Sequence, residues 1–299
     1  MTETVEHPRP STTLVRALWS TCLLFAGVGL LLPLTGNTAL FAPWREAAAR
    51  ALLGASRLPA ELEPLAGLTD GILGGSIVGK WLAAAWLVRH PLAAGKRWAW
   101  WALVAGLLAW FSLDSGMSLA LGAGFNLWMI NAAPLLVFGG LLLVARRSTS
   151  SGPPPSPPPS RAWSMLGWVC LAFAALGIVV ATASHTPILA LYQRAIADAW
   201  FQGTLPAGAV AWMRLTYALI GATFLGHFLM LALALRFAPG KRWVLEAVAV
   251  SMLGWFLVDA TASAMHDAWF NVVMIDLPSL VAVALPWWWA WRGRREPRP

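Results

Sequence analysis

Polar side chains that could bind a solute or exchange protons recur inside otherwise apolar stretches of this chain. Asp114 and Ser118 stand four residues apart, as do Asp259 and Ser263, and this spacing places each pair on one face of a helix. The other polar residues of these stretches are Lys80, Asn126, Asn131, His227, Asn271 and Asp276. Together these groups could form a solute or ion site, or perform acid–base catalysis.

The spacing of these residues does not favour a specific catalytic chemistry. No nucleophile stands at a fixed spacing from a base, and the five histidines are scattered rather than spaced as metal ligands. Cys22 and Cys170 each lie within an apolar run and form no disulfide or metal-binding pattern. We therefore expect no cofactor and no metal, and we favour a non-catalytic function over an enzymatic one.

The composition indicates which elements must position these groups. The chain has 299 residues, of which 59% are hydrophobic and 11% are charged, and its mean hydropathy is +0.65. Globular domains average roughly 25% charged residues. The composition therefore excludes a water-soluble globular protein, a disordered chain and a disulfide scaffold, and it predicts an all-α integral membrane protein.

Eight apolar runs are long enough to cross a bilayer, which requires about 20 residues. They lie near 16–34, 67–88, 98–120, 126–145, 162–183, 213–235, 243–264 and 269–290. The short connection between the third and fourth runs predicts a tight hairpin, as does that between the seventh and eighth. One end of each hairpin would collect carboxyl, hydroxyl and amide groups.

The chain contains an internal repeat. Aligned without a gap, residues 95–140 and 240–285 share 16 identities in 46 positions, and these include the Asp and Asn of each hairpin. The offset is 145 residues there and 147 to 148 residues in the two preceding runs. The sequence thus predicts a tandem duplication of a four-helix unit, with the two copies related by a parallel pseudo-two-fold axis.

These patterns predict five segments. A tail over 1–15 precedes the first repeat at 16–145, and a Ser/Pro-rich linker over 146–161 leads to the second repeat at 162–291, followed by a basic tail over 292–299. The linker contains Pro-Pro-Pro-Ser-Pro-Pro-Pro, which cannot be helical and favours an extended, solvated chain.

The basic residues predict the orientation. Fifteen of the 21 Lys and Arg residues fall on one side if the N-terminus is cytoplasmic, which satisfies the positive-inside rule. We therefore expect a multi-pass protein of the cell membrane, inner or plasma, with both termini in the cytoplasm. The net charge of +8 is explained by this topology, and no nucleic-acid-binding motif accompanies it.

The long connection after the first span of each copy carries a helical pattern. Apolar residues recur at helical spacing from Pro187 to Trp200, and more weakly from Pro43 to Leu52. The pattern fits either a helix lying in the membrane interface or a cap packed over the bundle, and the two are compatible.

The buried charges predict specific partners. Side chains lean towards the N-terminus of their own helix, so Lys80 and Asp114, on antiparallel spans, lean towards one another. We expect a Lys80–Asp114 pair and a His227–Asp259 pair, within a copy or across copies. Polar groups that only hold helices together are the alternative.

Three functions fit these expectations. The favoured one is a carrier or binding protein for a small or amphipathic solute, held between the two four-helix units and near the polar residues. The second is a membrane enzyme acting on a lipid or another apolar substrate. The third is a non-catalytic subunit or assembly factor that docks on a membrane protein partner. All three imply contact with the lipid bilayer.

Overall fold

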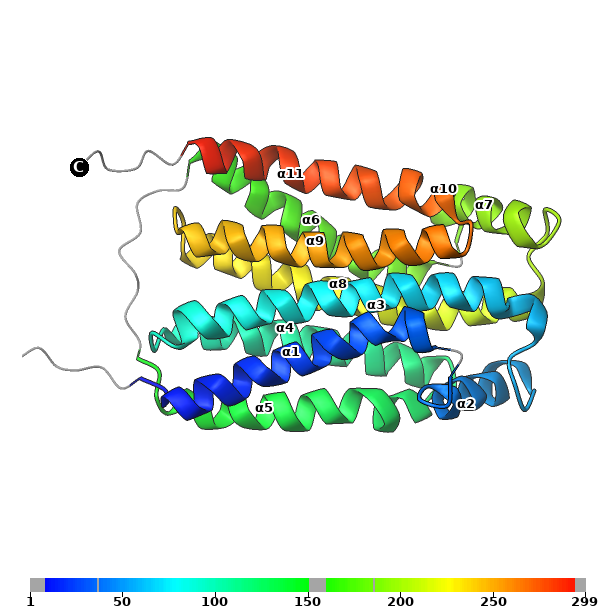
Figure 1. Ribbon diagram of the computed structural model, residues 1–299, viewed down its shortest axis with the longest axis horizontal. Coiled ribbons are helices and arrows are strands. Elements are labelled where there is room, and N and C mark those ends of the chain that lie inside the picture. The colour runs from blue at the N-terminus through cyan, green and yellow to red at the C-terminus, as the bar shows by residue number, and fades with distance from the viewer. Residues whose placement is uncertain (1–8, 37, 151–159, 185, 294–299) are drawn as a thin grey trace, which may run out of the picture.

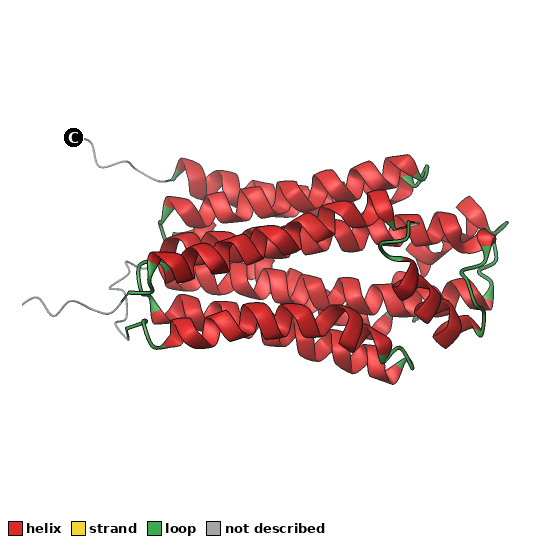
Figure 2. Cartoon of the chain, turned by 60° about the horizontal axis from the view of Figure 1, so that its bottom comes forward, coloured by secondary structure: helices red, strands yellow, loops and turns green. Residues whose placement is uncertain are grey.

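The chain folds into a bundle of long helices with short connections at its two ends (Figures 1 and 2). The computed structural model describes residues 9–36, 38–150, 160–184 and 186–293. Within these ranges no strand forms, and the only β-bridge joins Lys96 to Ser150. The predicted 146–161 linker and the two predicted tails lie largely outside the described residues.

The first half contains α1 (Thr12–Thr35), α2 (Ala42–Leu53), η1 (Ala60–Leu62), α3 (Glu63–Leu87), η2 (Val88–Leu92), α4 (Arg97–Ala120), η3 (Leu127–Asn131) and α5 (Ala132–Arg146). The second half contains α6 (Arg161–Ala183), η4 (Pro187–Leu189), α7 (Ala190–Trp200), α8 (Ala207–Phe237), α9 (Arg242–Met265), α10 (Trp269–Asn271), η5 (Val272–Asp276) and α11 (Leu277–Arg292). Side-chain oxygens of Ser11 and Ser160 cap the first helix of each half.

Eight of these helical segments are long and apolar enough to cross a membrane, which confirms the eight predicted runs. The second and sixth segments, Ala60–Leu92 and Ala207–Phe237, are longer than predicted, at 33 and 31 residues. Their additional turns pack in an apolar cluster around Leu62 and Trp212. Because protein rather than lipid covers these turns, apolar run length alone did not reveal them.

Helices α3 and α8 form the centre of the bundle. In the most apolar stretch of each of them, 78% of the residues are buried. In the corresponding stretches of α1 and α6 the buried shares are only 17% and 28%. Glycines permit the close contacts. A Cβ on Gly29 of α1 would lie 2.7 Å from the Gly74 carbonyl oxygen of α3, and one on Gly177 of α6 would lie 2.5 Å from the Gly221 oxygen of α8.

The central helices also join the two halves. A Cβ on Gly75 of α3 would lie 2.7 Å from the Trp255 carbonyl oxygen of α9, and one on Gly226 of α8 would lie 2.7 Å from the Gly106 oxygen of α4. The second long helix of each half therefore packs against the third long helix of the other half. These contacts between the two halves hold in place α4 and α9, which carry Asp114 and Asp259.

The short helices α2 and α7 lie at the end of the bundle opposite Arg146, Arg161 and Arg292 (Figure 1). We call it the cap end, and the other the basic end. Arg45 anchors α2 to α3 by donating to Glu63 at 2.9 Å and by pairing with Asp70. Ile188 of η4 and Leu191 of α7 are 63% and 73% exposed. One face of this segment therefore covers the bundle while apolar side chains face outward.

Candidate functional site

Four polar residues of the first half converge near the cap end. Asn126 and Asn131 donate to Oδ1 of Asp114 at 2.8 and 2.6 Å. Asn126 also donates to the Ser118 hydroxyl at 3.1 Å, and Ser118 donates to Asp114 Oδ1 at 3.4 Å. We call these four residues the first cluster. All are buried, so the carboxyl oxygen has exchanged water for protein donors.

A π-helical turn makes this geometry possible. In an α-helix, residues five apart point about 140° away from each other, so Asn126 and Asn131 could not both reach one oxygen atom. The π-helical turn η3, Leu127–Asn131, begins directly after Asn126 and ends at Asn131, and its wider winding brings Asn131 back to the side of Asn126. The second half has the same turn, η5, which ends at Asp276. Such turns inside helices frequently mark functional sites.

A second cluster forms 145 residues later from Asp259, Ser263, Asn271 and Asp276. Asn271 donates to Asp259 Oδ1 at 2.8 Å and to the Ser263 hydroxyl at 2.9 Å, and Ser263 lies 3.4 Å from Asp259 Oδ1. The Asn271 amide also reaches Asp276 at 3.4 Å. The predicted hairpins thus bring together eight of the ten candidate residues, as two sets of four.

Each cap helix contributes a polar residue that the sequence patterns did not identify. The Trp44 indole of α2 donates to Asn126 Oδ1 at 3.0 Å, and the Tyr192 hydroxyl of α7 donates to Asn271 Oδ1 at 2.7 Å. Burial raises the pKa of Tyr192 well above its ordinary value, which keeps the phenol a neutral donor. Trp44 and Tyr192 both fall on the inward face of the predicted helical patterns, but nothing in the sequence identified their partners.

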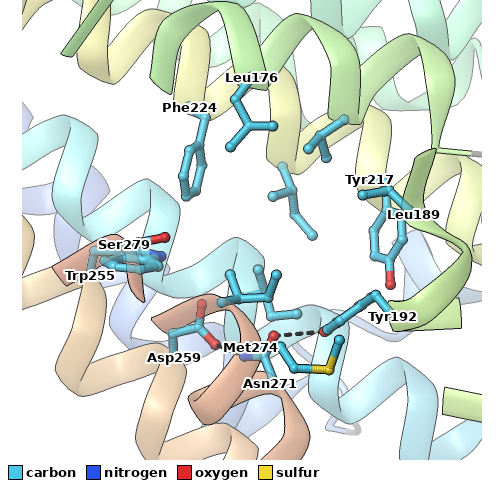
Figure 3. A pocket seen from close by; sticks show the side chains of 14 residues that line it. Leu176, Leu189, Tyr192, Tyr217, Phe224, Trp255, Asp259, Asn271, Met274 and Ser279 are labelled. Atoms are coloured by element: carbon cyan, nitrogen blue, oxygen red, sulfur yellow. Dashed lines mark hydrogen bonds between the residues drawn. The ribbon is translucent and has the colours of Figure 1, made fainter. Parts of the chain in front are cut away.

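Each cluster lies beside a cavity. The first cavity has a volume of about 190 Å³ and the second about 230 Å³. Val28, Leu73, Ile77, Trp110, Asp114 and Asn126 line the first, and their counterparts Leu176, Ile220, Phe224, Trp255, Asp259 and Asn271 line the second (Figure 3). Each is also lined from the central helix of the other half, by Leu219 and Thr223 in the first and by Ile72 in the second.

Both cavities reach the outer surface of the bundle. Val28 of α1 and Met129 of η3 are 40% and 44% exposed, and their counterparts Leu176 of α6 and Met274 of η5 are 43% and 38% exposed. The mouths therefore lie between the first and last long helices of each half, among exposed apolar side chains. Each of these two cavities lies mainly within one half, because α3 and α8 fill the centre; the expected site between the two four-helix units stays a prediction.

Lys80 lines the first cavity together with Asp114, but the expected direct pair does not form. Among the described residues no ion pair within 4.0 Å joins them. Instead the ammonium lies 3.4 Å from the centre of the Trp110 ring and 4.9 Å from that of Trp81. Trp110 stands one helical turn before Asp114, so its ring holds the cation in place by a cation–π contact.

His227 does not pair with Asp259 either. Its Nε2 is buried and has no hydrogen-bond partner, and its ring lies against Phe228, with centroids 4.6 Å apart. A Cβ added to Gly79 of α3 would lie 2.9 Å from the imidazole, so the ring fills the space beside a glycine of the central helix. His227 is therefore not part of either cluster.

Comparison of the chain with protein-family models, curated proteins and solved structures gave no match.

Proposed function

We propose that this chain is a membrane carrier or binding protein for a small amphipathic solute, built from two copies of one four-helix unit. The proposed duplication is supported by the hydrogen bonds that recur at a constant offset. The Asn126–Asp114 bond and the Asn271–Asp259 bond have the same length, 2.8 Å. Trp100 donates to the Leu142 carbonyl at 2.6 Å, and Trp287 donates in the reverse direction to the Leu245 carbonyl at 2.8 Å.

The observation that carries the functional proposal is the position of the two cavities. Each has apolar walls, a cluster of amide, hydroxyl and carboxyl groups at its inner side, and a mouth among exposed apolar residues. An amphipathic molecule could enter sideways from the bilayer, place its polar group against the cluster and keep its apolar part in lipid. Ligand sites between helices of a bundle commonly combine apolar walls with a few convergent polar groups.

The proposed orientation places the basic end in the cytoplasm. Arg97, Arg146, Arg161, Arg242 and Arg292 stand at helix ends there, as the positive-inside rule requires. Trp100 and Trp287 lie within one or two helical turns of these ends. Tryptophan rings are amphipathic and favour the membrane interface, which this position would provide. The cavities would then lie nearer the opposite face, beneath α2 and α7.

The test is to purify the full chain in a mild detergent and identify by native mass spectrometry the small molecules that stay bound. A stoichiometric amphipathic molecule, together with uptake of that molecule into reconstituted vesicles, would support a carrier. Chemical conversion of the molecule would instead support a membrane enzyme. A chain that is unstable without a partner and retains no molecule would support a subunit or assembly factor.

A further inference from the structure

The two cavities differ in charge. The first contains the Lys80 ammonium beside Asp114, and its π-helical turn ends in the neutral Asn131. In the second half the corresponding residues are His227 and Asp276, and His227 makes no bond to the cluster. Among the described residues, no Lys or Arg forms an ion pair with Asp259 or Asp276. The second cluster therefore gathers two carboxyl groups without a cationic side chain.

One buried carboxyl oxygen at the second cavity has no hydrogen-bond partner among the described residues. It is Oδ2 of Asp259, which belongs to a fully buried residue that lines the cavity. Figure 3 shows one oxygen of Asp259 bonded to Asn271 and the other directed away from that bond. Because a buried carboxyl oxygen without a partner is unfavourable, this atom points to a missing hydrogen-bond donor.

Aromatic rings surround the same space. Trp255 and Phe224 meet edge to face with centroids 5.8 Å apart, and Tyr192 and Tyr217 are 6.3 Å apart. Faces of such rings attract cations, and a buried carboxylate without a counter-ion is unfavourable. A primary ammonium group would provide the missing charge and donate an N–H to Asp259 Oδ2. An anionic group would be repelled.

We propose that the second cavity binds the ammonium group of an amphipathic amine, whose alkyl chain leaves past Leu176 and Met274 into the lipid. This inference rests on the proposed function and names its substrate class. The volume of about 230 Å³ is below the roughly 300–1,000 Å³ typical of drug-sized ligand pockets. The cavity therefore holds the headgroup and the first carbons, and the remaining chain contacts the bilayer.

The test uses the full chain in phosphatidylcholine nanodiscs and three photoactivatable probes. The probes share one diazirine-bearing alkyl chain and end in a primary ammonium, a hydroxyl or a phosphate, and labelled residues are mapped by mass spectrometry after normalising for partition into lipid. The ammonium probe is expected to label Leu176 and Met274 at least tenfold more than the other two probes, and more than it labels Val28 and Met129 in the first cavity.

Variants separate binding from folding. Asp259→Asn keeps an oxygen that can accept the Asn271 amide, so the thermal unfolding temperature should change little while ammonium labelling is abolished. Asp198→Asn, which removes an exposed acid on α7 outside the cavity, should leave it unchanged.

The outcomes distinguish the two proposals. Equal labelling of the second cavity by the hydroxyl probe, or ammonium labelling that survives Asp259→Asn, overturns the amine inference and leaves the carrier proposal standing. If none of the probes labels either cavity, both proposals are contradicted.

Discussion

The amide nitrogen of Asn271 lies 2.8 Å from Oδ1 of Asp259, and this bond links α10, at the start of the last span, to the buried carboxyl group of α9. The Asn271 carbonyl oxygen in turn accepts the Tyr192 hydroxyl of α7. One amide therefore connects three elements. Asn126 connects α4, α2 and the start of the fourth span in the same way.

Replacing either amide should destabilise the bundle. Asn271→Leu leaves the Tyr192 hydroxyl without its acceptor and Asp259 with only the longer Ser263 bond, and a buried unpaired group costs about 1–3 kcal/mol. We expect a lower thermal unfolding temperature in nanodiscs for Asn271→Leu and for Asn126→Leu. Val273→Leu, at a 63% exposed outer position, is the control and should shift stability by less than about 0.5 kcal/mol. Indistinguishable curves for all three variants would show that the clusters do not support the fold.

Two tyrosines beside the same cavity should respond differently to loss of the hydroxyl. Tyr192 donates to Asn271 at 2.7 Å, so Tyr192→Phe should lower stability by about 1–3 kcal/mol because it leaves a buried acceptor unpaired. Among the described residues, the Tyr217 hydroxyl makes no close hydrogen bond and interacts only with Tyr192, so Tyr217→Phe should cost less stability than Tyr192→Phe. Denaturant titration of both variants in the same detergent measures the difference, and the reverse order would contradict the described geometry.

Lys80 and Trp110 should be energetically coupled. The ammonium lies 3.4 Å from the ring centre, and a desolvated cation–π contact contributes about 2 kcal/mol. In a double-mutant cycle, Lys80→Met and Trp110→Leu should therefore be non-additive by more than about 0.5 kcal/mol. A second cycle pairs Lys80→Met with Trp163→Phe, whose indole bonds to the Leu235 carbonyl. That cycle should be additive, and equal coupling in the two cycles would argue against the contact.

Two glycines of α6 provide a matched test of helix packing. A Cβ on Gly177 would lie 2.5 Å from the Gly221 carbonyl oxygen, whereas one on Gly167 would have no neighbour within 4 Å. Gly177→Ala should push α6 away from α8 and cost about 1–3 kcal/mol. Gly167→Ala should be neutral or slightly stabilising, because alanine favours a helix by up to about 1 kcal/mol over glycine. Equal tolerance of the two changes would mean that the helices are further apart than described.

Low pH should destabilise the cap end of the bundle, because it favours protonation of His266. Burial, and then the charge of Arg45, lower the pKa of His266 below its ordinary value, while Asp267 acts in the opposite direction. The unfolded chain therefore binds a proton more readily, so stability is present above the ordinary histidine pKa of about 6.5 and falls as the pH drops below it. His266→Gln should flatten this part of the pH–stability curve, and a curve identical to that of the unchanged protein would exclude the imidazole as the cause.

Much of the helical architecture could be predicted from the sequence, because lipid imposes a length and a composition on each span. The hairpins also predicted which carboxyl, hydroxyl and amide groups meet, since Asp114 and Asn126 are close along the chain. Partners far apart in sequence were not predictable. The position of Lys80 depends on a ring of α4, and Tyr192 reaches Asn271 across 79 residues.

The π-helical turns could not be predicted from the sequence either. Periodicity assumes 3.6 residues per turn, and a regular α-helix would point residues five apart, such as Asn126 and Asn131, in different directions. In the structure both donate to one oxygen of Asp114. The cavities could not be predicted either, because their walls bring together residues that are far apart in the sequence. Each wall combines four spans of one half with residues of the other half, such as Ile72 in the second cavity.

The most direct test of the proposed function blocks both cavities at their mouths and measures bound solute. Val28→Trp combined with Leu176→Trp places an indole in each opening, and Leu24→Trp with Leu171→Trp adds the same bulk at exposed positions of α1 and α6 that line neither cavity. Native mass spectrometry of the purified proteins should show the amphipathic molecule on the unchanged chain and the control but not on the blocked variant. Equal retention by all three proteins would contradict binding in these cavities.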